Sequence, residues 1–228
     1  MDHLHQAHTS HEHSLRQELI CHLPYASFSV ALGIIVLSIF YFLGTAINAD
    51  QSLLRQSYHL LFHTFHYVHL VFAIAGTIIS FSRFSSDRMR CLLVSLISPA
   101  IFCTLSDVAL PTLAGRLLGI DVDLHICFFS LPDLANVLPF MMVGLITGFA
   151  ICAHNSTTEL KSFSLHSHFT HILIASLAAS FYIASYDVNA WHPVMGMLFL
   201  FLVIAVIVPC TIADVVVPLY CARWKSCS

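Results

Sequence analysis

Four histidines at helical spacing are the most distinctive chemical feature of this sequence. His59, His63, His66 and His69 follow one another at intervals of four, three and three residues. A helix with 3.6 residues per turn would place them within about 120° of one face and over roughly 15 Å of its length. Because imidazole is the commonest transition-metal ligand, this spacing predicts a metal-binding face. Taken singly, each histidine could equally be a hydrogen-bonded core residue.

A shorter histidine set follows in the second half of the chain. His168 and His171 lie on adjacent helical turns and share a face, whereas His166 lies off that face. Ionisable residues inside membrane segments tend to face the bundle interior or an aqueous cavity. We therefore expect both histidine sets to point inward, the second as a partial copy of the first.

Asp107 and Asp214 are the only acidic residues deep inside apolar segments. A carboxylate among neutral imidazoles offsets the charge of a bound cation, whereas either group alone would be poorly solvated in a low dielectric. We therefore expect each aspartate to complete one of two metal sites. The expected sites are an outer one of His63, His66, His69 and Asp107, with His59 at the outer mouth, and an inner one of His168, His171 and Asp214.

Cys103 and Cys210 each precede one of these aspartates by four residues and so share its helical face. Their thiolates would add soft ligands for a transition metal, although a buried cysteine often serves only as a small hydrophobe. Prolines flank both aspartates, and each removes a backbone N–H and frees a carbonyl upstream. These prolines are Pro99, Pro111, Pro209 and Pro218.

Both aspartates belong to an apparent internal repeat. Residues 103–111 and 210–218 are identical at five of nine positions, and similar histidine-containing segments, 66–70 and 168–172, precede them in the same order. The alternative is chance similarity between apolar segments. A duplication would give two units of three spans, and an odd number of spans forces the second unit into the opposite orientation. Such inverted repeats are common in secondary transporters.

The composition indicates a membrane protein. Of the 228 residues, 58% are hydrophobic and only 9% are charged, against roughly a quarter charged in soluble domains. The 16 histidines outnumber the nine lysines and arginines, and the net charge is -3, which gives no support for nucleic-acid binding. The eight cysteines form no CxxC pair, which argues against a disulfide scaffold or a zinc ribbon.

Six apolar segments reach the length of about 20 residues that a bilayer-spanning helix needs. We predict an all-α polytopic membrane protein with spans at 27–48, 58–82, 91–118, 133–153, 167–186 and 194–220. The expected organisation is a His-rich cytoplasmic segment 1–26 without a signal peptide, three-helix units 27–120 and 133–220, an external loop 121–132, and a cytoplasmic tail 221–228. The N-terminal segment could hold metal ions loosely or be a solvated tail.

Positive charge predicts the orientation in the membrane. With both termini in the cytoplasm, seven lysines and arginines lie inside and only Arg55 and Arg116 lie outside. This distribution follows the positive-inside rule. The expected location is a bacterial inner membrane.

Together these features predict an integral membrane transporter or channel for a divalent transition metal, zinc or iron, rather than an enzyme. Histidine suits exchange of metal for protons, because a bound cation displaces protons from the same nitrogens. The expected partners are the lipid bilayer, the metal ion and protons, and no nucleic acid is expected. The sequence is compatible with a homo-oligomer. One alternative is a membrane oxidoreductase with a His-ligated di-metal or haem site. Another is a proton-conducting or complex-forming membrane subunit.

Overall fold

The structure is a computed structural model that describes the backbone of residues 15–155 and 157–223 and the side chains of residues 19–155 and 168–222. Within the described backbone every regular element is helical, and six helices are long and apolar enough to cross a membrane. The predicted all-α class with six spans is therefore confirmed. The histidines whose side chains lie outside the described residues are His3, His5, His8, His11, His13 and His166.

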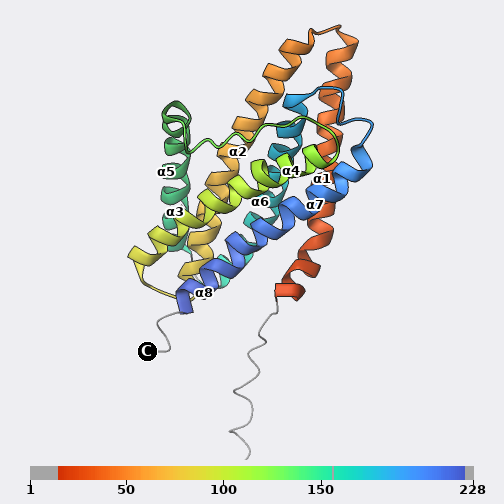
Figure 1. Ribbon diagram of the computed structural model, residues 1–228. Coiled ribbons are helices and arrows are strands. Elements are labelled where there is room, and N and C mark those ends of the chain that lie inside the picture. Colours follow the sequence, from red (N-terminus) through yellow and green to blue (C-terminus); the bar gives the residue numbers. More distant parts are fainter. Residues whose placement is uncertain (1–14, 156, 224–228) are drawn as a thin grey trace, which may run out of the picture.

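Ten helical segments make up the six spans (Figure 1). In chain order they are α1 (Leu15–Ala46), α2 (Gln51–Ser82), α3 (Arg88–Thr104), η1 (Leu105–Ala109), α4 (Leu110–Leu117), α5 (Leu131–His154), α6 (Thr157–Tyr186), α7 (Met195–Thr211), η2 (Ile212–Val216) and α8 (Val217–Arg223). The third span is the uninterrupted series α3, η1 and α4, and the sixth is the matching series α7, η2 and α8. Both η1 and η2 are π-helical.

The first helix begins earlier than the sequence predicts. It starts at Leu15, inside the segment 1–26 that was expected to be polar and to precede the membrane, and its apolar portion begins at Leu19. Pro24 lies within the helix without ending it, because a proline removes only one backbone N–H and membrane helices tolerate that loss. The hydropathy pattern marks where polar residues become rare, whereas the helix itself continues past that point.

α2 and α6 form the centre of the bundle and are its most buried spans. Tyr58 faces Phe181 with ring centroids 5.8 Å apart, and His69 faces His171 at 4.4 Å. Residue numbers therefore rise along α2 as they fall along α6, and the two helices run antiparallel. Small buried residues of α6, such as Ala175, Ala178 and Ala179, permit close approach of its neighbours. We call the end where α2 begins the His59 end, and the opposite end of the bundle the His168 end.

The two outer helices, α1 and α5, each pack on helices of the other predicted unit. α1 packs on α6 and α7, whereas α5 packs on α2 and α3. Each outer helix therefore lies against helices of the other unit, so that residues 27–120 and 133–220 interlock. Glycines allow both contacts: a Cβ on Gly33 of α1 would lie 3.2 Å from the backbone oxygen of Ser176, and one on Gly144 of α5 would lie 3.0 Å from that of Val71.

The third and sixth spans lie side by side in opposite directions (Figure 1). α3 contacts α8 and α4 contacts α7, while the π-helical segments reach the central pair, η1 against α6 and η2 against α2. Each aspartate-bearing segment is thus carried to the histidine-bearing helices at the middle of the bundle.

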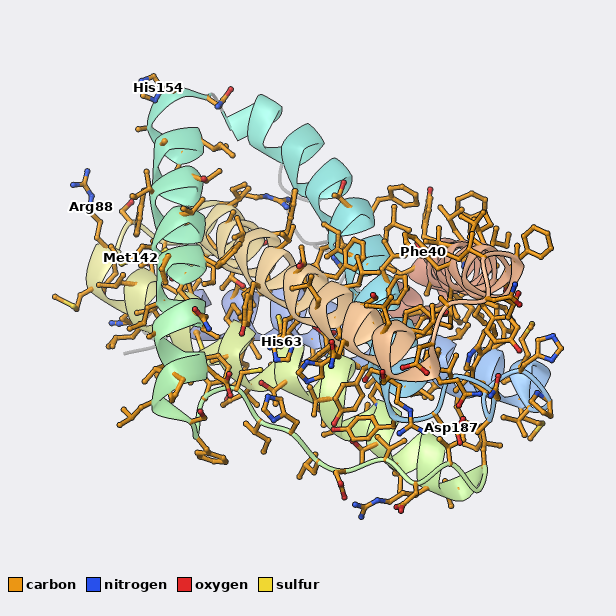
Figure 2. The ribbon with its side chains drawn as sticks, turned by 90° about the horizontal axis from the view of Figure 1, so that it is seen from above. Phe40, His63, Arg88, Met142, His154 and Asp187 are labelled. Carbon is orange, nitrogen blue, oxygen red and sulfur yellow. The ribbon has the colours of Figure 1, made fainter. Side chains whose placement is uncertain are left out.

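Large apolar side chains cover the outside of the bundle. Met142 on α5 projects away from the centre in Figure 2. Phe42, Ile146, Ile97 and Ile204, from four different spans, are each more than half exposed. An apolar outer surface of this kind is suited to lipid.

The glycine contacts of α5 give a test of the packing. Replacing Gly148 with alanine should lower the free energy of unfolding in detergent by about 1–3 kcal/mol, the usual cost of overpacking. The new Cβ would meet Ile78 Cδ1 at 2.7 Å and the backbone Cα of Ala75 at 3.1 Å. Gly196→Ala is the matched control, since a Cβ there meets no atom of the described residues within 4 Å. Equal thermal stability of the two variants would contradict the close packing of α5 on α2.

Candidate metal centre

Each buried aspartate lies in a π-helical segment, and the sequence explains why. Asp107 lies in η1 and Asp214 in η2, and in each case a proline, Pro111 or Pro218, follows four residues later. Proline has no N–H to bond the carbonyl four residues before it, and its ring crowds that carbonyl. The residue that follows each π segment instead bonds five residues back, Leu110 N–H to Leu105 O and Val217 N–H to Ile212 O. Such π-bulges frequently occur at functional sites.

The first half-site joins Asp107 to two histidines of α2. Asp107 Oδ2 accepts hydrogen bonds from His66 Nδ1 at 2.8 Å and His69 Nδ1 at 2.7 Å, and Oδ1 accepts from the Ser106 hydroxyl at 2.6 Å. All four side chains are buried. Because a carboxylate only accepts hydrogen bonds, Nδ1 of each ring carries the proton. Nε2, on the far side of each ring, is then the atom available to a metal ion.

The second half-site repeats this arrangement with one difference. Asp214 Oδ2 accepts from His171 Nδ1 at 2.6 Å and from His168 Nδ1 at 3.2 Å. Alanine at position 213 occupies the place of Ser106, and Asp214 Oδ1 is buried without a hydrogen-bond partner in the described residues. Nε2 of both histidines is likewise buried and unpartnered there. The second half-site therefore has more atoms without a hydrogen-bond partner that could bind a metal ion than the first.

The two half-sites meet at the centre of the bundle. The rings of His69 and His171 have centroids 4.4 Å apart. Cys103 Sγ lies 3.7 Å and Cys210 Sγ 3.9 Å from His69 Nε2, and Cys210 also interacts with His171. Donor atoms of His69, Cys103 and His171 all lie within 4.8 Å of one another. The sequence predicted two separate sites, each with its own cysteine, whereas the structure brings both cysteines to one place.

This centre has the donors of a transition-metal site. His69, Cys103 and His171 supply two imidazoles and one thiol, and Cys210 brings a second thiol beside His69. Imidazole and thiolate donors together are typical of zinc or of iron–sulfur chemistry. The aspartates contact the Nδ1 atoms, so they orient the histidines and stabilise their tautomer, as carboxylates commonly do beside metal-bound histidine. His168, His171 and Asp214 form a second buried group of donors within 4.8 Å. The residues thus fit a metal ion, with Asp107 acting through its two histidines.

One residue of the expected outer site, His63, lies apart from Asp107. Asp107 receives its histidine hydrogen bonds from His66 and His69, and the expected contact with His63 is not formed. His63 instead donates from Nδ1 to the backbone oxygen of His59 at 2.9 Å, and the two rings lie 4.4 Å apart. The reason is distance along the helix, since one turn of α2 carries His63 about 5 Å from His66 towards the His59 end.

The metal-site residues predicted from the sequence do not include two residues of the connection between α4 and α5. His125 lies 5.5 Å from His63 between ring centroids, and Cys127 is buried beside them within the same donor group. His22 of α1 was assigned to the N-terminal segment, but its ring lies 4.4 Å from that of His168. For His125 and Cys127 the sequence signal is a histidine and a cysteine two residues apart. This spacing does not reveal the path of the connection, and so it does not predict that the two residues reach His63.

The histidines form a continuous series through the bundle, which we call the histidine chain. Ring contacts join His59 to His63, His69 to His171, His171 to His168 and His168 to His22. Between these, His63 and His66 both adjoin Cys127, and His66 and His69 share Asp107. In Figure 2 His63 lies near the middle of the bundle, whereas Arg88 and His154 lie at its edge. The chain therefore extends inside the protein from the His59 end to the His168 end.

Compared with known proteins, the chain matches no family model, no curated protein and no solved structure. The similarity that bears on the site is internal. His66, His69 and Asp107 repeat the contacts of His168, His171 and Asp214, and η1 repeats the backbone of η2.

Proposed function

We propose that the protein transports a divalent transition metal ion, zinc or iron, across the membrane along the histidine chain. The observation that carries this proposal is the continuity of the chain from one end of the bundle to the other. Binding a resident metal needs one set of ligands, whereas passing an ion through needs neighbouring donors at every step. Intramembrane ionisable residues are costly and commonly mark ion pathways, which explains their concentration on α2 and α6.

The mechanism we propose uses the two half-sites as inverted counterparts. An ion held near His66 and His69 would pass between Cys103 and Cys210 to His171 and then to His168. Each transfer replaces one imidazole nitrogen by the next without exposing the ion to lipid. Metal binding displaces protons from histidine and cysteine, so metal would exchange against protons. Rocking of two units about a fixed midplane site is the behaviour of inverted-repeat transporters.

Charge at the two ends supports a sidedness for this transport. Arg83, Arg88 and Arg90 lie at the His168 end, where α2 ends and α3 begins. By the positive-inside rule, this cluster supports our proposal that the His168 end and both termini face the cytoplasm. The membrane we propose is a bacterial inner membrane. Acidic residues gather at the opposite end, which would attract cations: Asp50, Asp121, Asp123, Asp133 and Asp187.

Flux measurements test the proposal. In proteoliposomes, His66→Ala and His168→Ala should each reduce uptake of zinc or ferrous ions at least tenfold, because each removes one donor from a different half of the chain. His154→Ala is the control, since this exposed histidine ends α5 and bonds only the backbone oxygen of Ala150 among the described hydrogen bonds. Wild-type flux in both chain variants would refute the assignment.

The complete burial of the central ligand atoms favours a second function. His69, His171, Cys103 and Cys210 are at most 1% exposed, and a closed site without an open position is typical of a resident metal. The protein would then be a membrane oxidoreductase or a proton-conducting subunit. Metal analysis with a visible spectrum separates these functions: tight stoichiometric iron favours the enzyme, exchangeable zinc favours transport, and proton flux insensitive to chelators favours the proton pathway.

A further inference from the structure

We propose that His63, His125 and Cys127 form a further metal site, separate from the buried donors at the centre of the bundle, which loads ions at the His59 end of the histidine chain. The ligand class is a borderline cation of the zinc type, since imidazole and thiolate donors select against magnesium, calcium and manganese. The loading role rests on the proposed transport function, whereas the binding site itself does not. We call these three residues the loading site.

The donor atoms of the loading site already lie together. One ligand atom from each residue lies within 4.8 Å of the other two. His63 donates from Nδ1 to the backbone oxygen of His59, so Nε2 holds the free lone pair, and it is buried without a hydrogen-bond partner in the described residues. A backbone carbonyl on Nδ1 is the usual support for a histidine that binds metal through Nε2.

A carboxylate stands beside these donors. Asp133 Oδ2 lies 3.5 Å from His125 Nε2, close enough to contribute an oxygen ligand or to balance the charge of a bound cation. The ring of His59 lies 6.1 Å from that of His125. The surroundings therefore supply further donors that a small adjustment could bring to the ion.

Backbone hydrogen bonds fix the connection that carries His125 and Cys127. Arg116 Nε donates to Val122 O at 2.8 Å, and the Tyr182 hydroxyl of α6 donates to Asp123 O at 2.6 Å. The backbone N–H of His125 in turn donates to the Tyr182 hydroxyl at 3.2 Å. These three bonds hold the connection against the bundle from Val122 to His125, and Cys127 is only 1% exposed.

The loading site is reachable where the central donors are not. A cavity of about 670 Å³ at the His59 end is lined by His59, His63, Tyr67 and Asp133, among others. His63 and His125 are only partly buried. On its inner side, Cys127 interacts with His66, the first histidine of the Asp107 half-site. The three residues therefore stand between an open cavity and the buried part of the chain.

Cobalt binding to the full-length protein in detergent tests the site, because a cobalt–thiolate bond gives a charge-transfer absorption that histidine ligands alone do not. The Cys103→Ser/Cys210→Ser variant should keep part of this absorption, through Cys127. Adding Cys127→Ser should abolish it, and adding Cys152→Ser, a half-buried cysteine of α5, should leave it unchanged. Absorption that survives Cys127→Ser would overturn the proposal.

A second variant guards against misfolding. His125→Gln, at a partly exposed position, should weaken cobalt binding at least tenfold in the Cys103→Ser/Cys210→Ser protein while the melting temperature stays the same. Unchanged affinity would also overturn the site. If cobalt binds as expected but wild-type protein carries no metal flux, the loading site stands and the transport proposal falls. If flux is normal and Cys127 binds no cobalt, the transport proposal stands and the loading site falls.

Discussion

Replacing Asp214 with alanine is expected to abolish metal flux and to destabilise the protein. Asp214 Oδ2 accepts the Nδ1 protons of His168 and His171, and alanine would leave both buried donors without an acceptor. Each such loss costs about 1–3 kcal/mol. The two rings would also lose the support that holds Nε2 in place, and removal of a carboxylate of this kind commonly lowers metal affinity 10–100-fold.

Asparagine variants distinguish the effect of the aspartate negative charge from the effect of the hydrogen bonds that the histidines donate to it. Asp107→Asn keeps an acceptor for the two histidines and directs its amide nitrogen to the Ser106 hydroxyl, which can accept. Asp214→Asn finds Ala213 at the corresponding position, so its amide nitrogen has no comparable partner. We therefore expect both asparagine variants to reduce flux, and Asp214→Asn to be the less stable of the two.

Flux in proteoliposomes and thermal unfolding in detergent measure these effects. Asp87→Asn is the control for the loss of one negative charge, because Asp87 lies at the N-terminus of α3, away from the histidine chain, and asparagine caps a helix about as well as aspartate. If Asp214→Ala retained both flux and stability, the aspartates would have no role in orienting the histidines. Equal stability of the two asparagine variants would show that the Ser106 hydroxyl does not stabilise the amide of the Asp107→Asn variant.

The second large effect is expected from the two cysteines of the central centre. The Cys103→Ser/Cys210→Ser variant should lose zinc affinity at the centre at least about 100-fold, since removing ligands costs more than removing their supporting partners. Serine keeps the size of the side chain but replaces a soft sulfur with a poor oxygen ligand. Metal flux should fall with the affinity.

Equilibrium zinc binding checks this expectation, with one fewer tightly bound ion per chain as the result. Cys91→Ser is the matched control, because Cys91 is as buried as the central pair, at 3% exposed, but lies near the start of α3. A similar loss of zinc binding in Cys91→Ser would mean that the effect arises from packing. Full zinc binding by the double variant would show that the cysteines are not ligands.

Local patterns in the sequence determined the helices and the faces that carry the site. Hydropathy fixes a spanning helix because each span must bury its own backbone hydrogen bonds in an apolar run. Helical periodicity then places His66 with His69, and His168 with His171, on shared faces. The two aspartates were expected to meet these faces because they are the only acidic residues deep inside apolar segments, and the structure forms hydrogen bonds from His66 and His69 to Asp107 and from His168 and His171 to Asp214.

Only the tertiary structure decided how these faces combine. The antiparallel packing of α2 on α6 and of the third span on the sixth brings Cys103 and Cys210 to one imidazole nitrogen, whereas spacing along the chain suggested two sites. Likewise, the Tyr182 hydroxyl fixes His125 from 57 residues away. Such contacts depend on the shapes of surfaces from distant parts of the chain. Helical period and hydropathy describe each segment alone, and therefore carry no information about which donors finally meet.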